Sequence, residues 1–401
     1  MAIERENYSR LLEAIAEDID IPPSKYQDAV DRYKSVGRWL EGGGYPGSWS
    51  VLNVYPQGSF RLGTVTKPPP GSVNRDYDID LVAELPIAKS QTDPKSIKAM
   101  IGNRLREHGL YVKMLDDEGR RCWTLIYSEE DGVGFHLDVL PSASDGQASQ
   151  DTSIAITNKQ GGAYEWLSSN PKGYGVWFDE KNRGAFERVA FDQKRAIQAR
   201  AREIYSRVDD VPDQLVRTPL QRSIQLLKRH RDVMFCEPAQ QGSAPISIIV
   251  TTLAAHFYRG EGDVYSALTG IVSKFRAHAA LVDNAGVDHS IAPSSPIKRT
   301  SDGRWYLANP VDPLENFADR WHEDGHRRAK AFFAWVERVH ADLVDPPFAT
   351  TSASAIKDRL SAVLGAGGGP RFGDLLVAAP PSVEKAVRVH ISQGTKPWRG
   401  E

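Results

Sequence analysis

The amino-acid sequence predicts a protein of class α/β + α, in which a lobe built on a mixed β-sheet is followed by a helical lobe. The chain has 401 residues, 40% of them hydrophobic, whereas a single core rarely serves more than about 250 to 300 residues. From residue 51 to about 140, short β-type segments alternate with one charged helical stretch, as they do in mixed α/β folds. Beyond about residue 160, helical patterns dominate. These three observations favour two lobes with a cleft between them.

The first element expected is an amphipathic helix after Pro22 and Pro23. Ser24 is a candidate N-cap with Gln27 three positions later, which is a capping-box pattern. Apolar side chains recur near helical spacing at Tyr26, Val30, Tyr33, Val36 and Leu40. The helix is expected to end in the three glycines at 42–44, because glycine readily adopts the left-handed conformation that closes many helices.

Four strands and two further helices are expected next. The strand-like segments are VLNVY at 51–55, DYDIDLVAEL at 76–85, RCWTLIYS at 121–128 and VGFHLDVL at 133–140. A helix is expected in KSIKAMIGNRLREHGL at 95–110. In the second lobe, Thr218 as cap, Pro219 at the first helical position and Gln221 at the third predict a helix over 218–235.

Aspartates alternate along the second of these strands and are the candidate ligands of a metal site. Alternate side chains of a strand share a face, so Asp76, Asp78 and Asp80 are expected on one face while Tyr77, Ile79 and Leu81 pack on the other. Two unit charges 4 Å apart repel by roughly 4 kcal/mol at an effective dielectric constant near 20. Divalent cations with oxygen ligands relieve such repulsion, and a pair of Mg²⁺ ions supports phosphoryl or nucleotidyl transfer. Mn²⁺ is a possible substitute.

A resemblance to a known family rests on these residues and on two further motifs. GSFRLGT at 58–64, then DIDLV at 78–82 and a third aspartate, Asp138, on a later strand resemble the polymerase-β-type nucleotidyltransferases. The GSxxxGT spacing is similar to oligoadenylate synthase, to cyclic GMP–AMP synthase and especially to the bacterial CD-NTases, which make cyclic oligonucleotide second messengers for antiphage signalling. The resemblance covers about 50–322 and includes PLQRSIQLLKRHRD at 219–232, SIIVTTLAA at 247–255 and NPVDP at 309–313.

The resemblance implies a domain plan and a reaction. It implies N-terminal helices at 1–48 that bridge the lobes, a polymerase-β-like catalytic lobe at 49–160, a helical lobe at 161–390 and a C-terminal tail at 391–401. An NTP such as ATP or GTP would be joined to an acceptor hydroxyl with release of pyrophosphate, and a second round would close a cyclic di- or trinucleotide. Such a product implies a downstream effector protein as partner, in CBASS signalling.

The resemblance also implies roles for individual residues. Asp78 and Asp80 would hold both metal ions, and Asp138 would complete the second metal site. Gly58 and Ser59 would contact the donor phosphates, as would two residues of the helical lobe, Lys228 and Ser247. The pair Asp76 and Asp78 remains an alternative to Asp78 and Asp80, since three acids alternate here.

Several of these residues have plainer interpretations that the sequence leaves open. On the helix from 218, Lys228 lies at the edge of the apolar stripe, where it can point inward or be solvated, whereas Arg229 lies opposite the stripe. Arg231 falls inside the stripe and should pair with a carboxylate or face the cleft. Ser247 could simply cap a helix after Pro245. His136 is read as a structural histidine rather than a catalytic one.

The segment His322-Glu323-Asp324-Gly325-His326 matches the zinc-protease pattern H-E-x-x-H. We reject this interpretation because Asp-Gly is poor helix material, and a helix break is expected there instead.

The composition of the chain argues against two other functions. Fifty Lys and Arg balance fifty-two Asp and Glu, which argues against a long nucleic acid as partner and hence against a template-free RNA-tailing or linear oligonucleotide synthase of the same superfamily. The presence of all the acids argues against an inactive nucleotide-binding module. Two cysteines and the lack of a long uncharged apolar run lead us to expect a cytoplasmic protein with no membrane segment.

Overall fold

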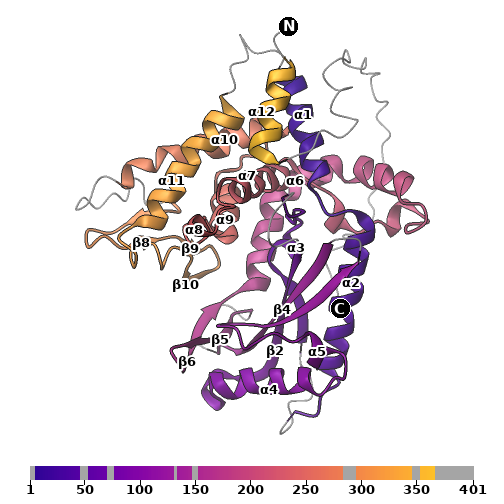
Figure 1. Ribbon diagram of the computed structural model, residues 1–401, viewed down its shortest axis with the longest axis vertical. Helices are drawn as coiled ribbons and strands as arrows, with labels where there is room; N and C mark the ends of the chain where they lie inside the picture. Colours follow the sequence, from indigo (N-terminus) through magenta and orange to yellow (C-terminus); the bar gives the residue numbers. More distant parts are fainter. Residues whose placement is uncertain are drawn as a thin grey trace.

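The computed structural model divides into a sheet lobe and a helical lobe, drawn in the lower and upper halves of Figure 1. It describes residues 5–45, 53–69, 76–130, 133–146, 152–282, 295–345 and 353–365. The predicted tail at 391–401 lies outside the described residues. None of the helices in the described ranges combines the length and the apolar character needed to cross a membrane.

A mixed six-stranded sheet forms the first lobe, as predicted. Its order is β1-β2-β4-β5-β6, with β3 also paired to β4. β2 and β4 run parallel, and the other pairs are antiparallel. The strands are β1 (Asn53–Gln57), β2 (Tyr77–Ala88), β3 (Trp123–Glu130), β4 (Val133–Ser144), β5 (Ile154–Gln160) and β6 (Ala163–Ser169). The four expected strands are confirmed as β1 to β4, and the β5–β6 hairpin carries the sheet on to Ser169.

Helices α2 (Pro23–Glu41), α4 (Pro94–Arg106) and the short α5 (Tyr111–Met114) pack their apolar side chains with those of the strands into one core. The predicted first helix is confirmed as α2, but its ends differ from expectation. It begins at Pro23 rather than after a Ser24 cap, and Pro22 occupies the N-cap without a side-chain bond, because proline at the first helical position already has a helical φ. At the other end Gly42 has φ −78°, so the expected left-handed closure is wrong.

The second lobe has its own helical core. Its longer helices are α1 (Arg5–Asp18), α6 (Pro171–Arg200), α7 (Pro219–Met234), α9 (Ser247–Phe257), α10 (Val264–Ala277), α11 (Arg327–Val339) and α12 (Ala353–Leu364). Short elements connect them: α8 (Pro238–Gln241), β7 (Lys298–Arg299), β8 (Trp305–Tyr306), β9 (Ala308–Asn309), β10 (Asp312–Asn316) and a π-helical turn (His340–Val344). Single 3₁₀ turns follow at Val208–Asp210, Asp213–Leu215 and Ala279–Leu281, and one more, Lys89–Gln91, lies directly after β2 in the first lobe. The predicted helix over 218–235 is confirmed as α7, with Thr218 and Gln221 forming the capping box.

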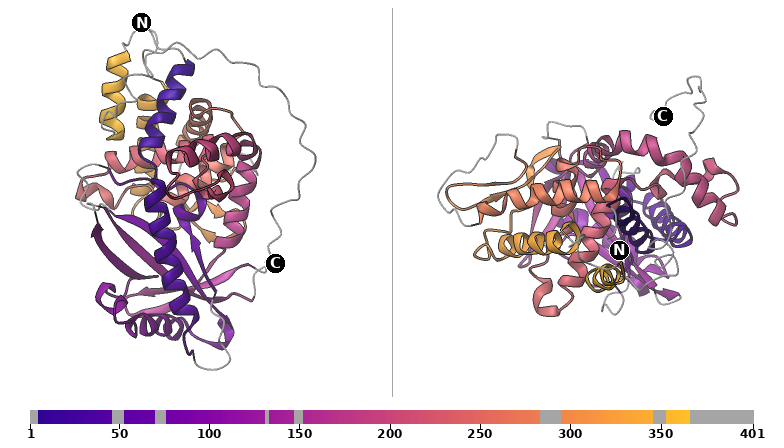
Figure 2. Two further views of the ribbon diagram at one scale, coloured as in Figure 1. Left: turned by 90° about the vertical axis from the view of Figure 1, so that its right-hand side faces the viewer. Right: turned by 90° about the horizontal axis from the view of Figure 1, so that it is seen from above.

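The first two helices connect the lobes. Leu11, Leu12 and Ile15 of α1 are buried in the helical core, whereas Tyr26 and Val30 of α2 are buried in the core of the sheet lobe. The two helices follow each other from one lobe into the other (Figure 2, left). The junction between them, residues 19–22, therefore lies where the lobes meet.

Candidate functional site

A cavity of about 1120 Å³ lies between the lobes, lined by β2, β4 and the short helix α3 (Gly58–Leu62) on one side and by α7 and α9 on the other. Every residue predicted for the site lines it: Gly58, Ser59, Asp78, Asp80, Asp138, Lys228 and Ser247. The first and last of these residues, Gly58 and Ser247, are 189 positions apart in the chain. The structure thus brings together all the residues that the sequence analysis singled out.

Asp80 and Asp138 are held side by side by the pairing of two strands. In the parallel register of β2 with β4, Asp80 is the partner of Asp138 and Asp78 is the partner of His136. On the opposite face of β2, Tyr77, Ile79 and Leu81 are buried, as the alternation predicts. The apolar face anchors the strand, so the carboxylates are presented to the cavity from a rigid element.

The Gly-Ser segment packs directly on Asp80. Gln57, the last residue of β1, pairs with Asp80 in the antiparallel register, and α3 begins at the next residue. Gly58 has φ +62°, and a Cβ at this position would collide with Asp80 Oδ2 and lie 3.0 Å from Asp80 Cγ. Only glycine fits here, because both the backbone conformation and the space exclude a side chain. This close approach brings Gly58 and Ser59 to the carboxylates across which a triphosphate would lie.

Electrostatics at the carboxylates favour a bound cation. Burial, then the carboxylates of Asp138 and Asp78, raise the pKa of Asp80 to about 7, while Lys228 acts in the opposite direction. The pKa of Asp78 is raised by desolvation and then by Asp138. Its side chain is 70% exposed and lines the cavity. Thr124 Oγ1 on β3 donates to Asp138 Oδ1 at 2.5 Å. Sequence reasoning missed Thr124, although the β3–β4 pairing places it opposite Asp138.

Asp76 is engaged differently from the other two aspartates of β2. It accepts a hydrogen bond from the amide of Gly134 at 3.0 Å, and its Oδ2 lies 2.8 Å from His136 Nε2. His136 is thus a partner of Asp76, and its Nδ1 also lies 3.9 Å from Asp78 Oδ1. Because Asp80 rather than Asp76 is the register partner of Asp138, the geometry favours Asp78 and Asp80 over Asp76 and Asp78.

Lys228 points from α7 into the cavity and is not a solvated surface residue. Its side chain is 6% exposed, and Nζ donates to the carbonyl of Thr64 at 2.9 Å. Burial, then the Arg231 guanidinium, lower the pKa of Lys228 to about 8, against the opposite effect of nearby carboxylates. Lys228 thus places a cation beside the segment that follows α3.

Arg231 and Ser247 form a second polar group on the helical side of the cavity. Arg231 NH1 donates to Ser247 Oγ at 2.9 Å and to the carbonyl of Pro245 at 3.0 Å, and its NH2 pairs with Asp232 at 2.6 Å. Both expectations for Arg231, a carboxylate partner and a place at the cleft, are confirmed. Ser247 is the first residue of α9 and Ile246 is its N-cap, so the alternative of a serine cap is wrong.

The donor set fits Mg²⁺ or Mn²⁺ in an open site. Asp78, Asp80 and Asp138 offer oxygen ligands, which these ions prefer. Among the described residues, no group of three or more His, Cys, Asp or Glu side chains is arranged to hold a metal ion by itself. Mg²⁺ commonly binds one or two carboxylates and completes its coordination with waters and substrate phosphates, so an open arrangement of three carboxylates suits it.

The H-E-x-x-H segment is a turn, as expected from its Asp-Gly pair. Residues 321–326 form turns and α11 begins only at Arg327. His326 Nδ1 accepts from Trp305 Nε1 at 3.0 Å, and its Nε2 lies 3.2 Å from Arg299 NH2. The two histidines therefore do not share one face of a helix, the arrangement that this zinc motif needs.

The fold and the cavity define a two-lobed nucleotidyltransferase, and comparisons with known proteins place it in a family. No family model matches the sequence. A c-di-GMP synthase from Roseivirga ehrenbergii is 30% identical over 335 residues, which cover 83% of this chain and 78% of that protein. The cyclic dinucleotide synthase CdnG from Bradyrhizobium diazoefficiens is 26% identical over 320 residues, covering 78% of this chain and 70% of that protein. The solved structure of the Bradyrhizobium CD-NTase CdnG in complex with GTP superimposes with a TM-score of 0.64 at 23% identity, over 92% of this chain and 98% of the other.

The chain belongs to the CD-NTase family. It is a nucleotidyltransferase of the kind that makes cyclic oligonucleotides, and its fold is that of CD-NTases. The resemblance drawn from GSFRLGT, DIDLV and Asp138 is thereby confirmed at the level of family, fold and type of reaction.

Proposed function

We propose that this protein joins two GTP molecules into cyclic di-GMP and releases two pyrophosphates. The observation that carries the proposal is the register of β2 with β4, which sets Asp80 beside Asp138 in a cavity that also receives Gly58, Ser59 and Lys228. The choice of GTP and of a cyclic dinucleotide is supported by the relatives, one of them a c-di-GMP synthase and another solved with GTP. The cavity volume of about 1120 Å³ exceeds the range of about 300 to 1,000 Å³ for single small ligands, which suits two nucleotides.

The reaction assigned to the cavity is an in-line displacement carried out twice. A ribose hydroxyl of the acceptor attacks the α-phosphorus of the donor, a new P–O bond forms, and the bond to pyrophosphate breaks. The linear product then presents its own hydroxyl and triphosphate for the second, ring-closing step. Two divalent cations held by Asp78, Asp80 and Asp138 would stabilise the negative charge on the attacking and leaving oxygens.

The remaining residues are assigned to the donor phosphates. The backbone at Gly58 and Ser59 offers N–H donors beside the carboxylates, and successive backbone amides in a turn bind anions. Lys228 and Ser247 approach from the helical lobe. With residues from both lobes on one triphosphate, the α-phosphorus would be fixed in line with the acceptor.

We further propose that the product acts as a second messenger in CBASS antiphage signalling, read by a separate effector protein. The support is the family membership.

The reaction is tested by incubating the protein with each NTP alone and with all four, in Mg²⁺ or Mn²⁺, then with phosphatase. Mass spectrometry identifies any nucleotide that resists the phosphatase. Cyclic di-GMP from GTP alone is the expected product, and the Asp78→Asn, Asp80→Asn double variant serves as control. A linear oligomer, extension of added RNA, or activity retained by the control variant would each contradict the proposal.

A further inference from the structure

We propose that Asp20, which lies outside the catalytic cavity, is a positioning residue for the donor nucleotide. It acts by fixing α7 against the segment that follows Gly58 and Ser59, so that Lys228 and those two residues meet the triphosphate in one arrangement. The inference rests on the proposed function, because it deepens the role of the same cavity. It is carried by an unbroken set of contacts from Asp20 to the cavity wall.

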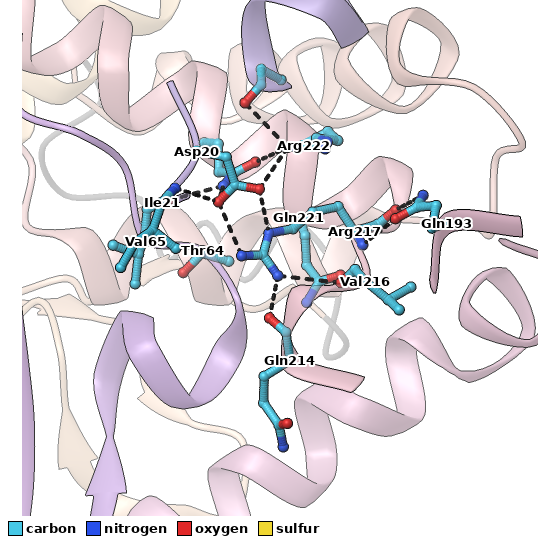
Figure 3. Close-up of polar contacts among 12 residues, drawn as sticks. Asp20, Ile21, Thr64, Val65, Gln193, Gln214, Val216, Arg217, Gln221 and Arg222 are labelled. Carbon is cyan, nitrogen blue, oxygen red and sulfur yellow. Dashed lines mark hydrogen bonds and ion pairs between the residues drawn. The ribbon is translucent and has the colours of Figure 1, made fainter. Parts of the chain in front are cut away.

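Asp20 lies in the junction between α1 and α2, and its carboxylate interacts with several side chains from α7 and the segment before it (Figure 3). Oδ1 accepts from Arg217 NH2 at 3.0 Å and from Gln225 Nε2 at 3.0 Å. Oδ2 lies 2.9 Å from Arg217 Nε and accepts from Arg222 NH1 at 2.9 Å. The side chain of Asp20 is 13% exposed. One carboxylate therefore joins the chain before α7 to two side chains on α7.

The backbone of residues 62–67, which we call the strap, follows α3 and crosses α7. Four of its carbonyls each accept a hydrogen bond from a different α7 side chain. These bonds are Gln221 Nε2 to Leu62 at 2.8 Å, Lys228 Nζ to Thr64 at 2.9 Å, Gln225 Nε2 to Val65 at 2.9 Å and Arg229 NH2 to Lys67 at 2.7 Å. Val65 of the strap is buried in the core of the sheet lobe, whereas α7 is part of the helical core, so these bonds hold the two walls of the cavity together.

Gln225 connects Asp20 to the strap directly. Its amide nitrogen donates one hydrogen to Asp20 Oδ1 and the other to the carbonyl of Val65, while its Oε1 accepts from Arg222 NH1 at 3.1 Å. Asp20 thus fixes the orientation of the amide that holds the centre of the strap. The strap is tied a second time to the same junction, because the amide of Lys67 donates to the carbonyl of Ile19 at 2.7 Å.

The position of α7 depends on the negative charge of Asp20, because two buried arginines need it. Arg217 and Arg222 are both buried, and a buried cation is tolerated only when it is paired. Arg222 has a second carboxylate, Glu13, at 3.0 Å. Without the charge of Asp20, one carboxylate would remain for two buried guanidinium groups, and α7 would shift to let them reach water. Lys228 and the strap would move with it.

The test is steady-state kinetics and hydrogen–deuterium exchange of Asp20→Asn. We expect KM for the nucleotide to rise at least tenfold while kcat changes less than threefold, because the carboxylates of β2 and β4 are untouched and bound triphosphate restores the arrangement. Exchange at the amides of Thr64 and Lys67 should become faster in the free protein.

Asp145→Asn is the matched control. Asp145 is also buried and paired with a lysine but does not line the cavity, so its loss should lower stability without changing KM or strap exchange.

Gln225→Met gives a second, uncharged test in case Asp20→Asn does not fold. It removes all three hydrogen bonds of the side-chain amide at similar volume, and we expect a smaller rise in KM and a smaller increase in strap exchange than in Asp20→Asn. Unchanged KM, unchanged strap exchange, or the same rise in KM in Asp145→Asn would each overturn the role of Asp20. A wild-type protein that makes no product from GTP would instead contradict the proposed function, and strap exchange in the two variants would still decide whether Asp20 holds the strap.

Discussion

Gly58 shows how one residue can limit a whole site. Its φ of +62° and the collision that any Cβ here would make with Asp80 Oδ2 are two separate reasons for glycine at this position. The backbone conformation alone costs other residues about 1 to 2 kcal/mol. The close approach to Asp80 adds a cost that falls on a carboxylate proposed to hold the metal ions.

We expect Gly58→Ala to lower activity at least about tenfold, since Asp80 must move to admit the methyl group and a small displacement of a reacting group is costly. Gly161→Ala is the matched control. Gly161 also has a positive φ, +55°, but open space around its Cβ position, so this variant carries the backbone cost alone. Thermal unfolding and product formation measured on both separate the two effects. Equal activity in the two variants would show that the contact with Asp80 is harmless.

Asp80 is expected to trade stability for function. Burial and two neighbouring carboxylates raise its pKa to about 7, so above pH 7 its charge destabilises the metal-free protein. Asp80→Asn removes that charge at nearly constant shape. We expect the melting temperature without metal at pH 8 to stay equal or rise while turnover falls about a hundredfold or more, because metal ions supply several kcal/mol of transition-state stabilisation. Calorimetry measures the melting temperature and product assays measure the turnover. A lower melting temperature in Asp80→Asn would contradict the claim that the charge of Asp80 destabilises the metal-free protein.

Among the elements, α7 was predictable from its sequence, but the burial of its residue Arg229 was not. Its capping box, its proline and its apolar stripe are local signals, and all were confirmed. Arg229 lies opposite the stripe by helical angle, yet it is only 2% exposed and donates to Lys67. The strap that covers it comes from more than 160 positions earlier in the chain, and no local pattern in α7 records such a neighbour.

The contact between β10 and the end of β6 is expected to make stability depend on pH. Glu315 accepts from Asn309 Nδ2 at 2.8 Å and from Ser169 Oγ at 3.1 Å, and burial raises its pKa to about 7. A raised carboxyl pKa means that the folded protein holds the proton more tightly than the unfolded chain. Its stabilising effect is therefore complete below about pH 4.5 and is lost as the pH rises through about 7.

Glu315→Gln should remove this dependence. We expect the variant to be more stable than the wild type by about 1 to 3 kcal/mol at pH 8, with the difference vanishing below about pH 5. Denaturant unfolding of both proteins across this range measures it, and Glu323→Gln, at an exposed position, is the control. A difference that does not vary with pH would contradict the raised pKa.

At the scale of the whole molecule, the sequence was sufficient to predict the two lobes, the first four strands and the seven residues that meet in the cavity. The acids and the Gly-Ser segment could be found because their chemistry depends on spacing within short motifs. The β5–β6 hairpin and the strap could not, since tertiary contacts rather than local periodicity hold them. The contacts of Asp20 could not be predicted from the sequence either, because a single acidic residue between two helices belongs to no recognisable motif.

Binding of metal and nucleotide should stabilise the protein only as a combination. We expect Mg²⁺ with a non-hydrolysable GTP analogue to raise the melting temperature by a few degrees, as about 2.7 kcal/mol follows from a ligand at a hundred times its Kd. EDTA, or the substitution Asp138→Asn, should remove most of the shift. Differential scanning fluorimetry measures it, and a full shift in the presence of EDTA would show that nucleotide binding needs no metal.

The assignment of α1 to one core and α2 to the other has a practical consequence for dissecting the enzyme. A cut near residue 170, which looks natural on the sequence, would leave the amino-terminal fragment carrying Leu11, Leu12 and Ile15 with nothing to cover them. The other fragment would lack a helix from its interior. Neither half is then expected to fold stably alone, because Tyr205, Val211 and Leu215 of the second half are also buried in the core of the sheet lobe.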